Sequence, residues 1–453
     1  MSTTNDAIYY FFPYQSSYFP LRFTFLIAII IVFDKRKNKM KKVKIGVLGV
    51  YRGRAMIDYC KHDKRVKLCA VCDLNEHALK QLKEELNDDS ISYYLEFDQM
   101  LNSDIDAVVL ANYANEHAPF AIKCLNAGKH VLSEVLPCQT MAEAVGLVEA
   151  VENSGKVYSY AENYCYMPAP REMRRLYRMG ALGDFEYGEG EYLHNCESIW
   201  PDITYGNQDH WRMNMSAFYY CTHSIGPLIH ITGLRPVKVT GFEMPFNARM
   251  ARMGAKAGWG SLIIITLENG AVLKSLHGVG PSKNSVWYSV YGSMGEAESA
   301  RESSELSDKM IFTNLDRYEG ENINRYVSYK PTDALTVKAG NMGHCGSDFF
   351  TMWNFITKIC GDDTAETIDV YEAMDMFLPG LMAYRSVLNG GIPMDIPNLK
   401  DKAMREQFRN DTACTDKKIA GNMLQPSYSK GNPVIPDEIY KKIKNDYLSR
   451  KEK

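Results

Sequence analysis

Two glycines and a later aspartate form the part of the sequence best suited to holding a phosphate-rich ligand. An apolar run over 43–48 predicts a buried strand, and Gly49 and Gly53 follow it in a tight turn. A second apolar run, 66–72, ends directly before Asp73. In the order strand, glycine turn, helix, strand and acid, backbone N–H groups at the helix start bind a pyrophosphate, and the acid accepts hydrogen bonds from a ribose. This order predicts a dinucleotide site.

The turn is irregular, because Tyr51 stands near the place of the usual middle glycine. We expect the helix to run from about Ala55 to Lys61, which puts Tyr51 and Arg52 in the turn beside the cofactor. The residues after Asp73 are Leu74 and Asn75, and neither can neutralise a 2′-phosphate. The site therefore favours NAD over NADP.

Tyr220 and His223 are three residues apart and are the pair best suited to moving protons. Imidazole titrates near neutral pH, and a tyrosine becomes useful when a cation or hydrogen bond lowers its pKa. If the pair opens a helix, both side chains share a face. Arg212 presents a planar set of donors that suits hydroxyls or a carboxylate. The structural alternatives are a turn-capping role for His223, a half-buried wall position for Tyr192, and a stacked pair of Arg212 with Trp211.

Composition narrows the class of protein. A chain of 453 residues suits two or three domains, and its net charge of −3, without a basic stripe, argues against a nucleic-acid partner. The eleven cysteines are odd in number and scattered, so we expect reduced thiols of a cytoplasmic protein. Cys69 and Cys72 point to opposite faces of a predicted strand, and the histidines form no His-x-x-x-His pair. We therefore predict no metal.

Residues 1–40 differ in composition from the rest. Their apolar run over 23–33 is short for a membrane-spanning helix and lacks the features of a signal peptide. Two interpretations remain, a weak membrane anchor or an extension upstream of a start at Met40, and we favour the second. Residues 1–39 are then expected to be dispensable, and a membrane partner is not expected.

Strands and helices alternate over residues 41–162. Besides the elements named above, the pattern predicts helices at 76–87, 117–127 and 141–154, and strands at 105–111, 130–134 and 157–161. Strands separated by helices imply a parallel sheet with right-handed crossovers. We predict an α/β domain here, with the doubly wound parallel sheet of a Rossmann fold.

The pattern changes in residues 163–400. A helix at 171–179 precedes runs typical of strands, at 185–194, 237–243, 261–267, 271–278 and 285–292. Glu268-Asn269-Gly270 is a hairpin turn signal. We predict an α+β substrate domain with a large mixed or antiparallel sheet, whose open face suggests a homo-oligomer. Residues 401–453 are expected to be a surface wrap or linker, with a solvated helix at 441–453.

Three segments resemble a known family. They are Gly-Lys-His-Val-Leu-Ser-Glu at 128–134, Asn-Glu-His at 115–117 and Ile-Asp-Val-Tyr-Glu-Ala at 368–373. Over about residues 41–398 the chain resembles the glucose–fructose oxidoreductase, inositol dehydrogenase and MocA (Gfo/Idh/MocA) family. Its members usually place Glu-Lys-Pro after this strand, and that lysine assists hydride transfer. Here Val135 follows Glu134, so the chain departs from the pattern of a simple alcohol dehydrogenase.

A set of further segments is similar to one branch of that family, the NAD-dependent α-N-acetylgalactosaminidases. The segments are Glu134-Val135, residues 162–166, 191–194, 210–212, 220–227 and 343–348. The resemblance implies proton transfer by Tyr220 and His223, and a sugar held by Tyr192 and Arg212. It also implies a set of cofactor-binding residues: Gly49, Tyr51, Arg52, Gly53, Asp73, Asn115, His117, Glu134, Val135 and Asn163.

The resemblance therefore implies a glycoside hydrolase that works by a redox route. A ring hydroxyl is oxidised, the leaving group departs by elimination, water adds, and the ketone is reduced again. The alternatives are an NAD-dependent sugar or polyol dehydrogenase and a cofactor-binding protein without catalysis. Val135 disfavours the dehydrogenase, and the pair Tyr220 and His223 disfavours the inactive protein.

Overall fold

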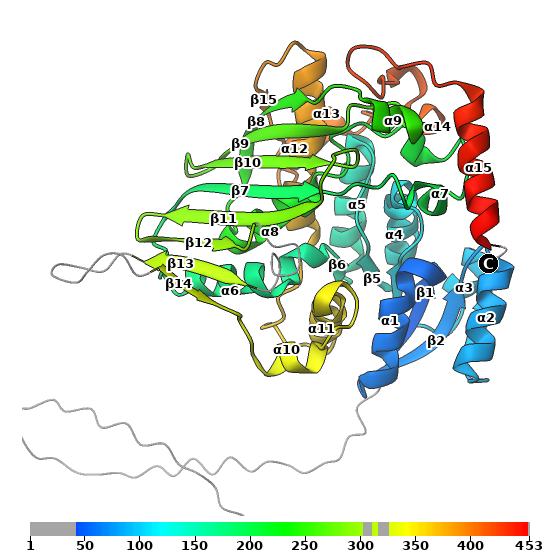
Figure 1. The fold of residues 1–453 in the computed structure, drawn as a ribbon. Helices are drawn as coiled ribbons and strands as arrows, with labels where there is room; N and C mark the ends of the chain where they lie inside the picture. Colours follow the sequence, from blue (N-terminus) through cyan, green and yellow to red (C-terminus); the bar gives the residue numbers. More distant parts are fainter. Residues whose placement is uncertain (1–41, 302–309, 316–325, 452–453) are drawn as a thin grey trace, which may run out of the picture. The chain divides into compact units, whose positions relative to one another are not determined.

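The computed structural model describes residues 42–301, 310–315 and 326–451 (Figure 1). The apolar run over 23–33 lies outside these residues. Across the described part, no helix combines the length and the apolar composition that a membrane crossing requires. All eleven cysteines lie within it as free thiols.

The first sheet is parallel and has six strands in the order β3-β2-β1-β4-β5-β6. Its strands are β1 (Val43–Leu48), β2 (Val66–Cys72), β3 (Ser92–Tyr94), β4 (Ala107–Leu110), β5 (His130–Ser133) and β6 (Tyr158–Tyr160). Strands buried on both faces need apolar side chains throughout, and all four residues of β4 are buried. This order is that of a doubly wound Rossmann sheet, which confirms the predicted fold of this part.

Five α-helices accompany this sheet. They are α1 (Val50–His62), α2 (Glu76–Leu86), α3 (Phe97–Leu101), α4 (His117–Asn126) and α5 (Met141–Ser154). The predicted start of the first helix at Ala55 is wrong, since α1 begins directly after Gly49. Tyr51, Arg52 and Gly53 therefore lie in the first turn of the helix and not in a loop. Gly53 lies inside this turn because α1 packs closely on β1: a Cβ at Gly53 would lie 2.6 Å from Cγ1 of Val47.

The second sheet is mixed and has nine strands, in the order β14-β13-β12-β11-β7-β10-β9-β8-β15. β7 and β10 run parallel, and the other pairs are antiparallel. The strands are β7 (Phe185–Leu193), β8 (Pro236–Glu243), β9 (Gly260–Leu267), β10 (Val272–Gly278), β11 (Ser285–Gly292), β12 (Gly295–Ser299), β13 (Ile311–Leu315), β14 (Tyr326–Tyr329) and β15 (Met394–Asp395). The sheet confirms the predicted α+β part, although the sequence pattern did not predict β12 to β15.

Helices join the two sheets and cover part of the second. They are α6 (Pro168–Arg178), α7 (Trp200–Ile203), α8 (Thr222–Thr232), α9 (Ala248–Arg252), α10 (Ala334–Ala339), α11 (Ser347–Ile359) and α12 (Val370–Leu388). Figure 1 shows α11 of the second part beside α1 of the first, and the two helices are in contact. Residues far apart in the sequence thereby meet next to the glycine turn.

Helix α8 packs directly on the central strand β7. A Cβ at Gly190 would lie 1.8 Å from the backbone oxygen of Ser224. Only a glycine in the strand permits this approach of helix and sheet backbones. The contact fixes the depth at which α8, and His223 near its start, lies above the sheet.

The tail after residue 400 is more ordered than its pattern indicated. It forms α13 (Lys402–Phe408), α14 (Lys417–Ala420) and α15 (Asp437–Lys451), of which only the last was predicted, from residue 441. Arg405 is 1% exposed and its guanidinium pairs with the Glu152 carboxylate of α5 at 2.5 Å. Ionic contacts of this kind hold the tail where apolar periodicity is weak.

Gly190→Ala is expected to lower the free energy of unfolding by roughly 1–3 kcal/mol, because the new methyl group must push α8 away from β7. The matched control is Gly146→Ala in α5, where a Cβ would meet only Cδ1 of Ile122 at 3.4 Å. Urea unfolding of both variants measures the difference. Equal stability of the two variants would contradict the close helix–sheet approach.

Candidate active site

A cavity of about 610 Å³ lies at the carboxyl ends of the Rossmann strands. Leu48, Cys72, Ala111 and Glu134 line it from the ends of β1, β2, β4 and β5. Ligands bind in doubly wound sheets at this edge, where the strand order reverses between β1 and β4. Residues of the second part close the other side, and the volume is in the range of small-molecule sites.

The glycine turn forms one end of the cavity. Gly49 has φ of 96°, and a Cβ there would lie 2.3 Å from the backbone oxygen of Ala111. Gly49 has no side chain to cap α1, and the N–H groups of the first helical turn have no partner within the helix itself. Tyr51 and Arg52 of this turn line the cavity. Gly53 faces the strand instead of the cavity.

Asp73 lies in the wall next to this turn. Its carboxylate accepts hydrogen bonds from the backbone N–H groups of Val50, at 2.7 Å, and Asn75, at 2.8 Å. These bonds hold the acid against the start of α1. A carboxylate fixed there suits a ribose adjoining a pyrophosphate on the helix, as the sequence predicted.

The middle of the cavity is lined by Glu134, Val135 and Asn163. Arg52 reaches into this region and pairs with Glu134 at 2.5 Å. The same guanidinium donates two hydrogen bonds, both 2.8 Å long, to the carboxylate of Asp348 on α11. Asn163 donates to Asp348 as well, at 3.0 Å. The three sequence-predicted residues Arg52, Glu134 and Asn163 therefore meet around Asp348, to which the sequence analysis gave no role.

The charges of this cluster are strongly perturbed. Burial alone raises the pKa of Asp348, but hydrogen bonds from Arg52 and His344 outweigh it and hold that pKa well below its usual range. Burial raises the pKa of Glu134, against the opposing charge of Arg52. Arg52 keeps its proton, because the two carboxylates raise its pKa despite the burial. Perturbed groups in a cleft are typical of functional sites.

Asn115 and His117 do not line the cavity. The backbone oxygen of Asn115 accepts a hydrogen bond from Gln139 at 2.8 Å, and Nδ1 of His117 lies 2.8 Å from the backbone oxygen of Leu136. Burial lowers the pKa of His117 to about 4, so its imidazole is neutral and donates this bond. Both residues support the segment that carries Glu134 and Val135 from behind.

Three tyrosines surround His223 at the far end of the cavity. Its ring centroid lies 4.5 Å from that of Tyr164, 4.6 Å from that of Tyr192 and 5.6 Å from that of Tyr220. The hydroxyl of Tyr192 is 3.1 Å from Nδ1 of His194. The structure thus brings together Tyr192, Tyr220 and His223, which the sequence analysis selected. Tyr164 was not selected from the sequence, although it lies next to Asn163 in the segment 162–166.

Tyr220 and His223 do not open a helix together. Helix α8 begins at Thr222, so Tyr220 lies in the preceding turn while His223 is in the first helical turn. The two still line one cavity. Arg212 lies between the rings of Trp211 and Tyr220, 4.4 Å and 5.3 Å from their centroids, and its Nη2 is 3.4 Å from the hydroxyl oxygen of Tyr220. Arg212 is therefore stacked between the two rings and also directed at the Tyr220 hydroxyl.

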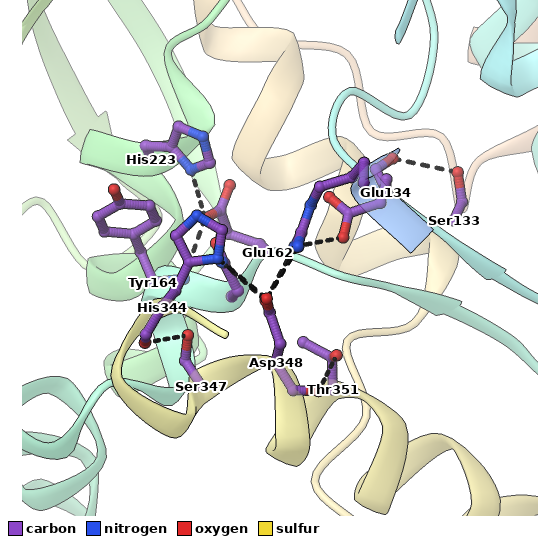
Figure 2. Close-up of polar contacts among 11 residues, drawn as sticks. Ser133, Glu134, Glu162, Tyr164, His223, His344, Ser347, Asp348 and Thr351 are labelled. Atoms are coloured by element: carbon purple, nitrogen blue, oxygen red, sulfur yellow. Dashed lines mark hydrogen bonds and ion pairs between the residues drawn. The ribbon is translucent and has the colours of Figure 1, made fainter. Parts of the chain in front are cut away.

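Glu162 is the residue beneath His223 that sequence reasoning passed over. Nδ1 of His223 lies 2.7 Å from Oε1 of Glu162, whose side chain has no exposed surface (Figure 2). A carboxylate that accepts the Nδ1 proton orients the imidazole and leaves Nε2 as the base. The acid stands directly before Asn163, in a segment quoted for the resemblance, but nothing in the local pattern indicates a partner on α8.

The cavity fits a dinucleotide in its volume, its glycine cradle, its helix N-terminus and its ribose-type acid. No group of three or more metal-ligating side chains occurs within the described ranges. The residues at the far end, an imidazole, phenols and a guanidinium, suit a polyhydroxylated ligand next to the nicotinamide.

Asp73→Ala is expected to weaken NAD⁺ binding by roughly 1.5–3 kcal/mol, the worth of hydrogen bonds to a charged group. The matched control is Asp88→Ala, since Asp88 is exposed and accepts a backbone N–H two residues later as Asp73 does. Calorimetric titration with NAD⁺ gives the affinities, and thermal melting checks that α1 remains folded. Unchanged affinity of Asp73→Ala would contradict the assignment.

Comparison with known proteins identifies two domains in the chain. Residues 43–162 match the model of an oxidoreductase family with an NAD-binding Rossmann fold, GFO_IDH_MocA, and residues 252–405 match that of the glycosyl hydrolase 109 C-terminal domain. A glycosyl hydrolase family 109 protein of Solibacter usitatus is 25% identical over 394 residues, which cover 79% of this chain and 88% of the relative.

Other relatives match over a shorter part. An alpha-N-acetylgalactosaminidase of Shewanella oneidensis is 28% identical over 206 residues, 42% of this chain and 44% of the relative. Glycosyl hydrolase family 109 proteins of other Shewanella strains likewise match over 44% of their length. The chain thus aligns with less than half the length of these curated relatives.

A solved structure of similar fold is an oxidoreductase from Agrobacterium radiobacter in complex with NAD⁺, L-tartaric acid and magnesium. It superposes with a TM-score of 0.63 at 14% identity, covering 79% of this chain and 99% of that protein. The chain therefore carries an NAD-binding domain of the Gfo/Idh/MocA family, followed by a C-terminal domain of the glycosyl hydrolase 109 type.

Proposed function

We propose that this protein is an NAD-dependent glycoside hydrolase that cleaves its substrate through transient oxidation of a ring hydroxyl. The observation that supports it best is the shared cavity: the same 610 Å³ space is lined by Gly49 and Asp73 at one end and by Tyr220 and His223 at the other. A hydrolase that needed no cofactor would have no use for this arrangement.

NAD, when bound, supplies a hydride acceptor for the first step and the hydride donor for the last. Oxidation of the hydroxyl to a ketone acidifies the neighbouring C–H. Nε2 of His223 then removes that proton, since Glu162 occupies the Nδ1 side of the ring. The leaving group departs by elimination, water adds across the resulting enone, and the ketone is reduced.

Tyr220 and Arg212 act on one group of the sugar, because Nη2 of Arg212 reaches the Tyr220 hydroxyl. In this role Arg212 holds a substrate oxygen, and Tyr220 gives or takes its proton. Tyr192 forms the wall over His223, with its hydroxyl turned to His194. Glu134, Val135 and Asn163 are assigned to the nicotinamide, and Asn115 and His117 to supporting that wall.

The substrate is proposed to be a glycoside, with an aryl α-N-acetylgalactosaminide as the first compound to test because a relative carries that activity in its name. We further propose a homo-oligomer in the cytoplasm that acts in carbohydrate metabolism, with residues 1–40 as an extension, 41–162 and 163–400 as its two domains and 401–453 as a wrap. The free thiols agree with a reducing compartment.

Tyr220→Phe and His223→Ala are expected to slow hydrolysis by about 10²–10⁴-fold, the usual worth of a general acid or base, with NAD⁺ affinity nearly intact. The redox route adds a second measurement. A substrate deuterated at the carbon next to the oxidised one exchanges its label with solvent during wild-type turnover. Retention of the label together with steady accumulation of NADH would instead identify a sugar dehydrogenase.

Glu162→Gln is expected to lower kcat by about 10²-fold or more while KM changes little, because the amide no longer fixes the tautomer of His223. The matched control is Glu372→Gln, since Glu372 pairs with Nδ1 of the buried His230 at the same 2.7 Å but outside the cavity. Steady-state kinetics on an aryl glycoside compares the two. Equal losses in both variants would indicate a structural role for Glu162.

A further inference from the structure

A second histidine reaches the cavity from the loop before α11. His344 lines the cavity, and 46% of its side chain is exposed. The backbone around it is unusual: φ is positive at four consecutive residues, 44° at Gly343, 40° at His344, 58° at Cys345 and 90° at Gly346. Side-chain-bearing residues rarely adopt this region, and such outliers cluster at functional sites. The left-handed backbone of this loop places the imidazole of His344 in the cavity.

A buried carboxylate orients the imidazole. Nδ1 of His344 lies 2.9 Å from Oδ2 of Asp348, which is 1% exposed. Asp348 is held in turn by the two hydrogen bonds from Arg52 and one from Asn163. Since Arg52 and His344 hold the pKa of Asp348 well below its usual range, the carboxylate is ionised and accepts the Nδ1 proton. Nε2 is then the nitrogen with a lone pair.

The cavity therefore contains two imidazole–carboxylate pairs, His223 with Glu162 and His344 with Asp348 (Figure 2). They differ in position. His223 lies among the aromatic residues of the far end, whereas the Asp348 of the second pair shares Arg52 with Glu134. His344 lines the same cavity as Glu134, on the side assigned to the nicotinamide, and as His194, which lies next to Tyr192 at the far end.

The redox route needs two separate proton transfers, one at the hydroxyl that is oxidised and one at the neighbouring carbon. The hydroxyl must lie next to the nicotinamide, where Val135 stands in the wall and cannot exchange a proton. His194 is also near, but its Nδ1 is directed at the Tyr192 hydroxyl and not at a carboxylate. Among the imidazoles that line the described cavity, His344 is the one that is bonded to a buried carboxylate and also lies near Glu134.

We propose that His344 is a further catalytic residue, which takes and returns the proton of the ring hydroxyl that is oxidised. In the forward direction the O–H proton moves to Nε2 of His344 as the C=O bond forms, and NAD⁺, when bound, would accept the C–H electron pair as hydride. In the last step the same proton returns to the oxygen. Asp348 is the positioning residue of this pair. The inference rests on the proposed function, because it assigns one of that function's two proton transfers.

The test uses full-length His344→Gly and His344→Asn, because both residues accept the left-handed backbone at this position. Stopped-flow absorbance follows the first appearance of NADH after mixing with an aryl glycoside and NAD⁺. We expect both variants to form NADH about 10²–10⁴-fold more slowly than the wild type. Added imidazole is expected to restore part of the rate in His344→Gly, since the half-exposed position admits it. His77→Ala, on the exposed face of α2, is the control.

His223→Ala separates the two transfers. It is expected to form NADH but to lose solvent exchange at the neighbouring carbon, whereas His344→Gly loses NADH formation itself. Wild-type rates of NADH formation in His344→Gly would overturn the proposal and leave the glycosidase untouched. If the wild type instead accumulates NADH without label exchange, the glycosidase proposal fails, and the role of His344 in oxidation is still decided by its own variants.

A measurement without turnover checks the orientation. In ¹⁵N spectra of histidine-labelled protein without substrate, the resonances lost in His344→Asn belong to His344. We expect them to report a proton on Nδ1 and a bare Nε2. A proton on Nε2 with a bare Nδ1 would contradict the bond to ionised Asp348, and with it the proposal.

Discussion

The Asp348 carboxylate is the group on which the rest of the active site depends. It lies almost fully buried on α11 and accepts hydrogen bonds from Arg52, Asn163 and His344. Arg52 belongs to the first turn of the cofactor helix, Asn163 follows the last Rossmann strand, and His344 comes from the second part of the chain. One carboxylate thus links the start of α1, the segment after β6 and the loop that carries His344. Removing a partner from such a buried ion pair leaves an uncompensated charge, which costs about 3–5 kcal/mol.

A large part of the Rossmann half could be predicted from the sequence, because its signals are local. Strand β2 ends directly before Asp73, and α5 has the bounds that periodicity gave it. The start of α1 was missed by five residues, since the requirement at Gly53 is a contact with Val47 on β1 and not a feature of its neighbours in the chain. Helix propensity depends on neighbours in the sequence, whereas Gly53 is required by a contact with another strand.

The second half of the chain was harder to predict from the sequence, because more of its structure depends on contacts between distant segments. Buried and less buried residues alternate along β9 and β10, but β15 has two residues and is defined only by its pairing with β8. The candidate site divides along the same line. Tyr192, Arg212, Tyr220 and His223 were selected from their types and from a family resemblance. Their partners Glu162 and Asp348 were not selected, because a buried acid shows its role only when the fold brings it 2.7 Å or 2.9 Å from an imidazole.

The two imidazole–carboxylate pairs differ in the structure that holds the imidazole: a packed helix for His223 and a loop for His344. His223 is held by rigid packing: α8 lies on β7 with backbone touching backbone at Gly190, and Tyr288 donates a 2.5 Å hydrogen bond to the carbonyl oxygen of His223 itself. His344 stands on a short run of left-handed residues before α11, where Asp348 bonds its imidazole and the Ser347 hydroxyl donates to its carbonyl oxygen at 2.9 Å. Proton removal from carbon demands a base that stays in place while a C–H bond breaks. Proton exchange with a hydroxyl tolerates a base that moves, because oxygen protons transfer readily between nearby partners. The rigid pair at the aromatic end and the loop-borne pair beside the nicotinamide therefore suit the two different protons that one redox glycosidase must move.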